Sequence, residues 1–520
     1  MSFARSLFTV SGLTILSRIG GFVRDTLTAI YLGAGPVADA FFVAQRLPNL
    51  FRSLFAEGAF SAAFVPLYTT EQERHGGKAA QRFAGHALAL LLSVLVPFSI
   101  LVMLFMPFVM KLLAPGFEDE PVKYQLAVDF SLITFPYLAL ISITALQGGV
   151  LNARGIFGPA AAAPIAFNII LIIGIFVAKF YHFHMGYTLA WSMLIAGVVQ
   201  MLWLVISCWR AKASIPLTRP KLTEASRRLF RRIGPGALGA GAAQVNLFIS
   251  TILASTLPTG AVSWLFYADR LNQLPLGIVG IAVATTLLPL LSRQVEAGRE
   301  DNTRHYMSRA IEFCLLLGLP STIGLTLAAQ PIIQTLFEHG RFTHADTVVT
   351  SQALVAYALG IPAFLLVKVF SAGFFARHDT ATPVKIAFIA MAVNVVASLI
   401  LLGPLQHIGI ALANSIAVWV NAILLFTQLR RRGKLGDKKL LGRMPRLLLC
   451  ALGMGFLTFR LVEMTAPWFE AGSLVEHLTG LAFIIGGAGL SYALMLHFSG
   501  AMALQDIRHM LKRRSGKVGT

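Results

Sequence analysis

Residues 84–112 read AGHALALLLSVLVPFSILVMLFMPFVMKL. Lys111 is the only Asp, Glu, Lys or Arg in this run, and a helix needs only about 20 apolar residues to cross the hydrocarbon layer of a membrane. The whole chain of 520 residues has the same character, since 56% of its residues are hydrophobic and 13% are charged. Soluble domains carry roughly 25% charged residues. The sequence therefore predicts an all-α integral membrane protein.

Apolar stretches of similar length recur along the chain and predict about fourteen transmembrane helices. The predicted spans are 8–32, 38–68, 84–112, 126–152, 158–180, 187–209, 234–257, 261–292, 308–336, 348–376, 384–403, 408–429, 446–464 and 474–498. Arg18 and Arg24 interrupt the first of them, and no small-residue cleavage site follows. We therefore interpret it as a retained transmembrane helix and not as a signal peptide.

Basic residues gather in alternate loops, for example at 74–82 after the second span and at 430–446 after the twelfth. The opposite loops are nearly bare of basic residues, and residues 118–120 are acidic. Because an excess of Lys and Arg marks the cytoplasmic side, both termini are predicted to be cytoplasmic. The net charge of +20 fits this pattern. No basic stretch is interleaved with stacking aromatic residues, so no nucleic-acid partner is expected.

An internal repeat appears at an offset of about 224 positions. Gly35, Phe41, Arg46 and Leu47 correspond to Gly260, Phe266, Arg270 and Leu271. A shift by six spans keeps the orientation, as in parallel repeats, although apolar helices can also resemble one another by chance. The repeat predicts two six-helix lobes, 1–220 and 221–433. A C-terminal helix pair with a basic tail follows at 434–520.

Charged residues inside predicted spans are the best indicators of function, because a charge near the bilayer centre costs several kcal/mol unless it faces a cavity or a partner. The first, second and eighth spans contain Arg18, Arg24, Asp25, Asp39, Arg46, Arg52, Glu57, Asp269 and Arg270. Their sum is cationic, and arginine forms bidentate pairs with phosphate. A cavity for an anionic ligand is one interpretation. Internal salt bridging, for example between Arg24 and Asp39, is the other. Lys368 and Glu312 look isolated and receive no role.

The sequence lacks several motifs that are typical of enzymes. The sequence has no GxxxxGK[ST] loop, no HExxH and no GxSxG. Cys208, Cys314 and Cys450 are far apart and are interpreted as small buried hydrophobes. His182 and His184 do not complete a metal site. We therefore expect no enzyme, no cofactor and no metal. Because the sequence has no ATPase motif, any transport by this chain would draw its energy from an ion gradient or the membrane potential.

Several motifs resemble the MurJ/MviN family over essentially the whole chain. The matching stretches are Ser17-Arg18-Ile19-Gly20-Gly21-Phe22-Val23-Arg24-Asp25, Asp39-Ala40-Phe41-Phe42-Val43-Ala44, Arg46-Leu47-Pro48-Asn49-Leu50, Phe55-Ala56-Glu57-Gly58-Ala59, Ala114-Pro115-Gly116-Phe117, Tyr267-Ala268-Asp269-Arg270 and Asp379-Thr380-Ala381-Thr382-Pro383-Val384-Lys385. The resemblance implies the multidrug/oligosaccharidyl-lipid/polysaccharide exporter fold, with two lobes around a cationic central cavity and a final helix pair that lines a groove for a lipid tail.

The family resemblance also implies a function. It predicts a flippase that moves lipid II, an undecaprenyl-pyrophosphate-linked disaccharide peptide, from the cytoplasmic to the outer leaflet of the bacterial inner membrane by alternating access. By similarity, the substrate-binding residues are Arg18, Arg24, Asp39, Arg52 and Arg270, with Asp25, Asn49, Glu57 and Ser263 as secondary candidates. Gln273 stands where relatives can have an acid. The acidic ligands of a sodium site are not matched, so a monovalent ion and the membrane potential both remain open as the driving force.

Three other functions remain open at this point. A flippase for another polyprenyl-linked oligosaccharide would have much the same chemistry. A cation-coupled multidrug antiporter of the same superfamily would favour an acidic cavity and twelve spans. A membrane scaffold for cell-wall synthases would tolerate loss of Arg24 and Arg270 together.

Overall fold

The structure is a computed structural model that describes residues 3–55, 59–432, 438–470 and 472–500. Side chains are described over these ranges except at 3–8, 51–55, 59–62, 230, 232–243, 278, 281–285, 438–439 and 441. Every regular element in the described ranges is helical. The predicted all-α membrane class is thus confirmed.

The chain folds into two compact units. The first contains the residues up to Ser263 together with His339–Thr343, and the second contains Trp264–Glu338 and the residues from His344 onward. The short returning segment is fixed to the first unit by the Arg341 N–H, which donates to the Ile30 carbonyl at 2.8 Å.

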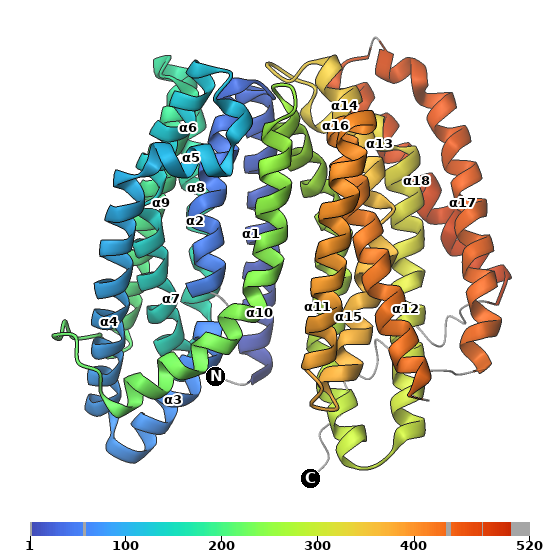
Figure 1. Ribbon diagram of the computed structural model, residues 1–520. Helices are drawn as coiled ribbons and strands as arrows, with labels where there is room; N and C mark the ends of the chain where they lie inside the picture. Colours follow the sequence, from blue (N-terminus) through green and yellow to red (C-terminus); the bar gives the residue numbers. More distant parts are fainter. Residues whose placement is uncertain (1–2, 56–58, 433–437, 471, 501–520) are drawn as a thin grey trace. The chain divides into compact units, whose positions relative to one another are not determined.

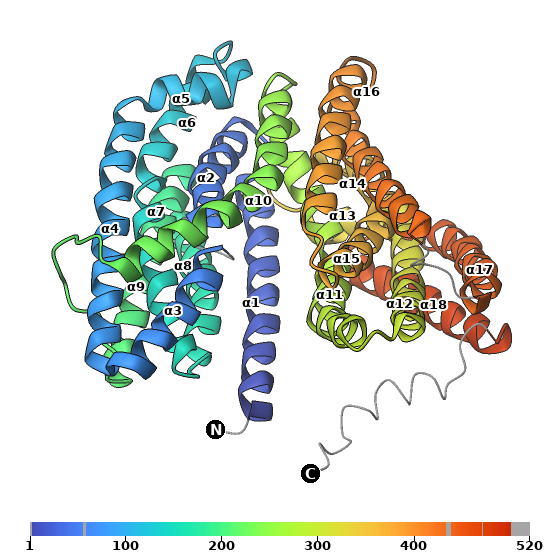
Figure 2. The same ribbon diagram turned by 60° about the horizontal axis from the view of Figure 1, so that its bottom comes forward.

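The first unit is a bundle in which α8 packs on α1 and α9, α2 packs on α6, and α3 packs on α4, α7 and α10 (Figures 1 and 2). Its helices are α1 (Phe3–Leu32), α2 (Pro36–Phe55), α3 (Ala59–His75), α4 (Gly77–Leu104), α5 (Met106–Leu113), the 3-10 turn η1 (Pro115–Phe117), α6 (Pro121–Thr134), α7 (Tyr137–Ala153), α8 (Gly158–Tyr181), α9 (Met185–Arg210) and α10 (Glu224–Ser255). Prolines at the starts of α5, α6 and α8 suit positions where the backbone N–H has no helical acceptor.

The second unit holds most of α11 and the helices that follow it. They are α11 (Ala261–Glu296), α12 (Glu300–Leu327), α13 (Ala329–Phe337), α14 (His344–Ala358), α15 (Ile361–Phe375), α16 (Ala381–Arg431), α17 (Lys438–Glu470) and α18 (Leu474–Phe498). The last two pack on each other, and α12 packs on α14, α15 and α17. A capping box formed by Ser473 and Glu476 begins α18.

Nine helical segments in the described residues are long and apolar enough to cross a membrane. They are Gly77–Leu104, Pro121–Ala153, Gly158–Tyr181, Met185–Arg210, Glu300–Leu327, His344–Phe375, Ala381–Arg431, Gly442–Glu470 and Leu474–Phe498. They correspond to the predicted spans from 84 to 209 and from 308 to 498. Four predicted spans have no counterpart among these nine segments. They are 8–32 on α1, 38–68 on α2 and α3, 234–257 on α10 and 261–292 on α11. These helices carry charges or include residues whose side chains are not described. The total of fourteen stays a prediction.

The structure divides one of the predicted spans, and it places a break between two others where the sequence predicted one. The span predicted at 84–112 is two helices, because the chain turns at Phe105 between α4 and α5. Conversely, the spans predicted at 384–403 and 408–429 lie within α16. Gln406 there has φ 48° and ψ −127°, a conformation that a helix does not contain, so α16 is two helices joined at a sharp kink.

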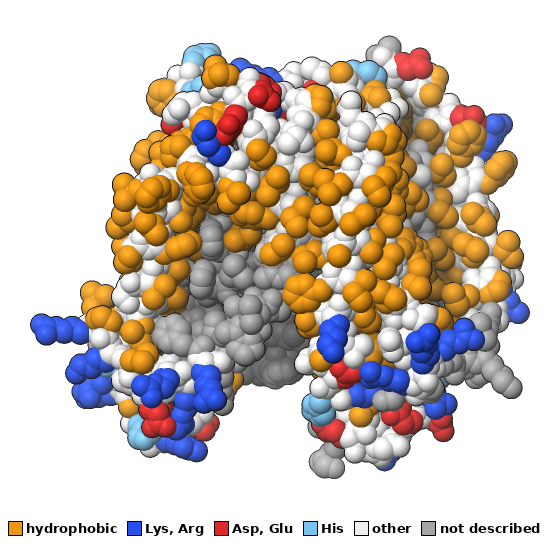
Figure 3. All heavy atoms as spheres, viewed as in Figure 1, with side chains coloured by type: hydrophobic (Ala, Val, Ile, Leu, Met, Phe, Trp, Pro, Cys, Tyr) orange, Lys and Arg blue, Asp and Glu red, His pale blue; other side chains and the backbone are white. Residues whose placement is uncertain are grey.

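Each unit has a large apolar core of its own. In the first unit Phe64 and Tyr68 of α3 pack against Phe83 of α4. In the second unit Leu365 and Phe370 of α15 lie in a cluster with residues of α11, α12 and α16. Figure 3 shows hydrophobic side chains across the middle of each unit and Lys and Arg side chains gathered toward one end, with a few at the other. This distribution is typical of a protein whose middle faces lipid.

The lobe division predicted from the repeat does not coincide with the compact units. The sequence comparison places a boundary near 220, whereas α10 packs on α2, α3 and α4 and belongs to the first unit. A repeat reflects similarity of sequence, whereas a compact unit reflects packing, so their boundaries need not coincide. The predicted lobes 1–220 and 221–433, with the segment 434–520, therefore stay a prediction.

Gly116 fits against the end of α10 so closely that no side chain has room. A Cβ atom there would clash with the Ser255 carbonyl oxygen and would lie 2.5 Å from the Thr256 Cα. We expect Gly116→Ala to lower the unfolding free energy in detergent by about 1–3 kcal/mol, the usual cost of overpacking. Gly35→Ala is the matched control, because nothing lies within 4 Å of the corresponding Cβ. Equal thermal midpoints for the two variants would contradict the close docking of η1 on α10.

Candidate functional site

Arg24, in the C-terminal half of α1, is a predicted site residue that is buried and whose guanidinium group has several partners. Only 8% of its surface is exposed. Its Nε and Nη2 donate to Oδ1 of Asp25 at 3.0 and 2.6 Å, and its Nη1 donates to Oδ1 of Asn168 at 2.9 Å. The guanidinium also lies 5.6 Å from the ring centroid of Phe167. A buried charge in this position is stabilised by its carboxylate, its amide and the ring face together.

Asn168 of α8 joins this arginine to the backbone of α1. While Oδ1 of Asn168 accepts from Arg24, its Nδ2 donates to the Ser17 carbonyl at 2.9 Å. Gly20 and Gly21 of α1 lie beside this amide, and a Cβ atom at either position would make an ordinary van der Waals contact with it. Sequence reasoning did not identify Asn168, because a single amide in an apolar helix has no distinctive pattern. Its position fixes the direction in which Arg24 points.

Asp39, in the first turn of α2, caps the start of α11. Its Oδ2 accepts the Gly260 N–H at 2.7 Å, and its Oδ1 accepts the N–H and the hydroxyl of Ser263 at 2.9 and 2.6 Å. A carboxylate at a helix N-terminus satisfies amide donors that have no helical acceptor and interacts favourably with the helix dipole. Here the cap comes from a residue more than 200 positions away in the sequence. Asp39 and Ser263, both predicted site residues, are therefore in direct contact.

Lys123 and Glu120 complete the surroundings of Asp39, and neither was identified from the sequence. The Nζ of Lys123 lies 3.4 Å from Oδ2 of Asp39 and 3.3 Å from Oε1 of Glu120. The hydroxyl of Thr259 donates to Glu120, and this bond together with Lys123 lowers the pKa of Glu120 despite some burial. A carboxylate with a lowered pKa contributes stability at neutral pH, and the contribution is lost as the pH falls through the lowered value.

No contact with these two groups is described for the other predicted site residues, and two of them have no described side chain. Arg18 is exposed on α1. Asn49 donates to the Gln45 carbonyl of its own helix at 2.9 Å. Arg270 is half-buried in the second unit, with its guanidinium 4.6 Å from the ring centroid of Phe266. Arg52 lies in α2 but its side chain is not described, and Glu57 lies outside the described residues. Roles in substrate binding stay predictions for all of these residues.

Internal pairing of the membrane charges is real, but the pairs differ from those that sequence reasoning suggested. Arg24 pairs with Asp25, the next residue of α1, while Asp39 pairs with Lys123. Glu312 was interpreted as isolated, yet its carboxylate contacts Arg309 and also Arg443 at 3.3 Å. This second pair connects α12 to α17 in the second unit.

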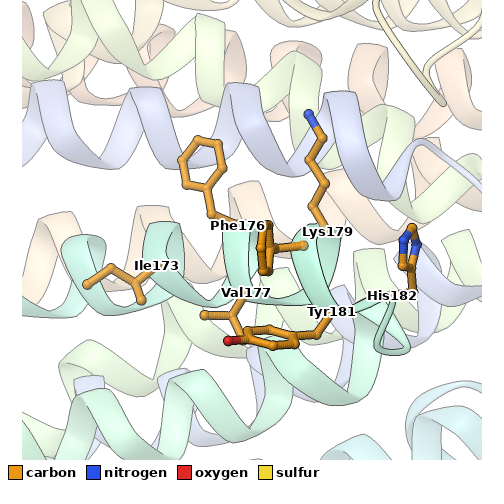
Figure 4. Close-up of a pocket in the computed structure, with 7 residues that line it drawn as sticks. Ile173, Phe176, Val177, Lys179, Tyr181 and His182 are labelled. Atoms are coloured by element: carbon orange, nitrogen blue, oxygen red, sulfur yellow. The ribbon is translucent and has the colours of Figure 1, made fainter.

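Two hollows lie on the apolar surfaces. One of about 750 Å³ is lined by residues of α8 and the following His182, and in Figure 4 Lys179 and Phe176 point to one side of the helix while Tyr181 points to another. Lys179 Nζ donates to the Tyr31 hydroxyl at 3.0 Å. Aromatic and basic side chains at a helix end are typical of a membrane interface. The other hollow, of about 460 Å³, lies in the second unit between α12 and α17.

We find no candidate metal site among the residues that the structure describes. No group of three or more His, Cys, Asp or Glu side chains comes together there. Cys208, Cys314 and Cys450 are free thiols buried at separate places.

Comparison with known protein families gives a match over most of the chain. Residues 28–480 match the family model described as "Lipid II flippase MurJ". The chain is 44% identical to "Probable lipid II flippase MurJ" of Rhizobium meliloti (strain 1021), over 99% of this chain and 97% of that protein. It is 35% identical to "Lipid II flippase MurJ" of Burkholderia cenocepacia, over 83% of this chain and 85% of that protein.

Solved structures give the same result at the level of the fold. "Lipid II flippase MurJ, inward closed conformation" superposes with a TM-score of 0.78 at 26% identity, covering 94% of this chain and 98% of that one. An inward-facing multidrug resistance MATE family transporter of the MOP superfamily has a TM-score of 0.69 at 15% identity, covering 82% and 97%. The second similarity shows a shared fold alone.

Proposed function

Because the chain belongs to the MurJ family, we propose that it is a lipid II flippase of the bacterial inner membrane. It is a multi-pass transporter and not an enzyme. In this proposal it carries lipid II from the cytoplasmic to the outer leaflet by alternating access, with both termini in the cytoplasm. The basic residues at one end of each unit support that orientation (Figure 3).

The observation that carries the proposal is the full-length similarity combined with an oriented arginine inside a membrane helix. Lipid II presents a pyrophosphate between its tail and its sugars, and an arginine fork binds phosphate oxygens with well-defined geometry. Arg24 uses three of its five N–H groups for Asp25 and Asn168. Its direction is thus set in advance, while donors remain for a phosphate oxygen. Arg18, on the same helix, supplies a second, exposed cation.

A route for the lipid tail is supported by the hollow between α12 and α17. Its lining is almost entirely apolar and includes Ile323 and Leu327 of α12 and Leu452, Phe456 and Phe459 of α17. Gly455 lies against Ile323, where a Cβ would come within 2.8 Å of the side chain. An isoprenoid chain can lie along such a surface without burying any polar group. In this way α17, the first helix of the C-terminal pair, would hold the tail together with α12 while the head group crosses.

The driving force is proposed to be the membrane potential or a monovalent ion. Moving one elementary charge through a potential of 100 mV supplies about 2.3 kcal/mol. Membrane lipids are the remaining partners, and nucleic acid has no place in the proposal.

Depletion and complementation test the function directly. In a strain depleted of its own lipid II flippase, the chain should restore growth, and lipid II should again become accessible to a degrading enzyme added outside the cell. Membrane abundance is the control. If the chain is abundant and lipid II stays inaccessible, the substrate assignment is wrong. Rescue of a strain that lacks a different polyprenyl-linked oligosaccharide flippase, or drug resistance without a cell-wall effect, would favour the corresponding alternative.

A further inference from the structure

Lys123 is a lysine in the first turn of α6 whose side chain is 2% exposed. Removing an ammonium from water is costly unless its three N–H groups find partners. They do, because Nζ lies 3.0 Å from the Thr259 hydroxyl and close to two carboxylates, those of Asp39 and Glu120. The Phe117 ring completes the enclosure, with its centroid 4.2 Å from Nζ. A site this complete is unusual for a lysine.

Three segments that are distant in the sequence meet at this ammonium. Asp39 comes from the start of α2, Glu120 and Lys123 come from the start of α6, and Thr259 comes from the turn between α10 and α11. The same turn is held a second time by Asp39, which accepts hydrogen bonds from Gly260 and Ser263. We call the residues Asp39, Glu120, Lys123, Thr259, Gly260 and Ser263 the outer latch, since the proposed orientation places them on the outer side.

The positive charge of Lys123 affects the ionisation of Asp39, and through it the hydrogen bonds of the outer latch. Asp39 is 1% exposed, and burial alone favours the neutral form of a carboxyl group. A neutral carboxyl keeps a proton on one oxygen, and that oxygen accepts hydrogen bonds less well. The adjacent ammonium stabilises the ionised form, in which both oxygens accept from the first turn of α11. Lys123 therefore acts on α11 through Asp39.

We propose that Lys123 is a positioning residue that keeps Asp39 ionised and aimed at the first turn of α11, and so sets how readily the α10–α11 turn separates from α2 and α6. This inference rests on the proposed transport function, because separation of the latch is taken as the step that opens the outer side. Lys123 is enclosed by these protein groups in the closed latch, with 2% of its side chain exposed. The residue controls access and not recognition.

The first test measures opening at Ala261, which is 1% exposed beside the latch. In a chain whose three buried cysteines are replaced by alanine, Ala261→Cys is treated with a membrane-impermeant maleimide added from outside. We expect Lys123→Met to speed labelling by at least about 100-fold, the scale set by the loss of one partner of a buried ion pair. Lys111→Met is the matched control, because Lys111 pairs with Glu118 at 3.3 Å but is 56% exposed. It should not change the labelling rate.

A second test shows whether Lys123 acts through Asp39. In the Asp39→Asn background, adding Lys123→Met should change labelling by less than about twofold, because coupled residues are not additive. Thr259→Val removes one contact to the ammonium without removing a charge, and should speed labelling in the same direction by a smaller factor. Thr259→Val can therefore still test the proposal if Lys123→Met does not fold.

The outcomes separate this inference from the proposed function. Unchanged labelling in Lys123→Met and Thr259→Val, at normal abundance, overturns the role of Lys123 whether or not the wild-type chain flips lipid II. Fully additive effects of Lys123→Met and Asp39→Asn would also overturn it, since Lys123 would then act independently of Asp39. Failure of the wild-type chain to restore outer exposure of lipid II overturns the proposed function, and the labelling experiment still reports on the latch.

Discussion

Replacing Arg24 by alanine should abolish complementation and lower the rate of lipid II flipping by at least about 100-fold, which is the scale of removing one member of a buried ion pair. Two losses add up in this variant. The cation that is proposed to meet the pyrophosphate is gone, and Asp25, 5% exposed, loses its arginine. Flipping measured in reconstituted vesicles at matched protein amounts checks the size of the effect.

The double variant Arg24→Ala with Asp25→Asn separates the two losses. The amide removes the buried charge that the single variant leaves beside a missing arginine, so stability should recover. Flipping should stay absent, because no guanidinium is restored. Recovery of flipping in the double variant would show that Arg24 only neutralises Asp25, and the binding assignment would then be wrong. Arg24→Lys is informative as well, since it keeps the charge and loses the fork that reaches both Asp25 and Asn168.

The sequence was sufficient for the membrane class and for the helices that are apolar along their whole length. Residues such as Ile173 and Phe176 of α8 face outward, as a chain surrounded by lipid allows. Boundaries were less predictable where one helix passes into another. The turn at Phe105 lies in apolar sequence, so hydropathy could not separate α4 from α5, whereas the kink at Gln406 falls between the two spans predicted at 384–403 and 408–429.

The site was predicted in part, because intramembrane charges are visible in the sequence while their partners are not. Arg24, Asp25, Asp39 and Ser263 were identified, and the structure brings them together as two separate pairs. Lys123 was missed because nothing in the sequence beside the acidic residues 118–120 signals that a lysine there is buried. Its burial depends on Phe117 and on a turn that lies far away in the sequence, and such packing is settled only by the fold.

Asp39→Asn should be the most damaging conservative change in the outer latch. The two side chains have nearly the same shape, so any effect comes from charge and from hydrogen-bond donors. The amide NH2 would face Lys123 or Ser263, both of which are donors, and the buried ammonium would lose its closest buried carboxylate. We expect a loss of about 3–5 kcal/mol in unfolding free energy, the usual cost of breaking a buried pair, and loss of complementation.

Ser263→Ala distinguishes the contribution of the Asp39 charge from that of one hydrogen bond to it. It removes one hydroxyl donor to Asp39, while the backbone N–H groups of Gly260 and Ser263 remain. A single hydrogen bond to a charged group contributes about 1.5–3 kcal/mol, so Ser263→Ala should be clearly milder in thermal unfolding and should keep part of the flipping activity. If the two variants were equally damaged, the hydroxyl would be the essential group. The ionised carboxylate and its pairing with Lys123 would then be incidental to how α11 is held.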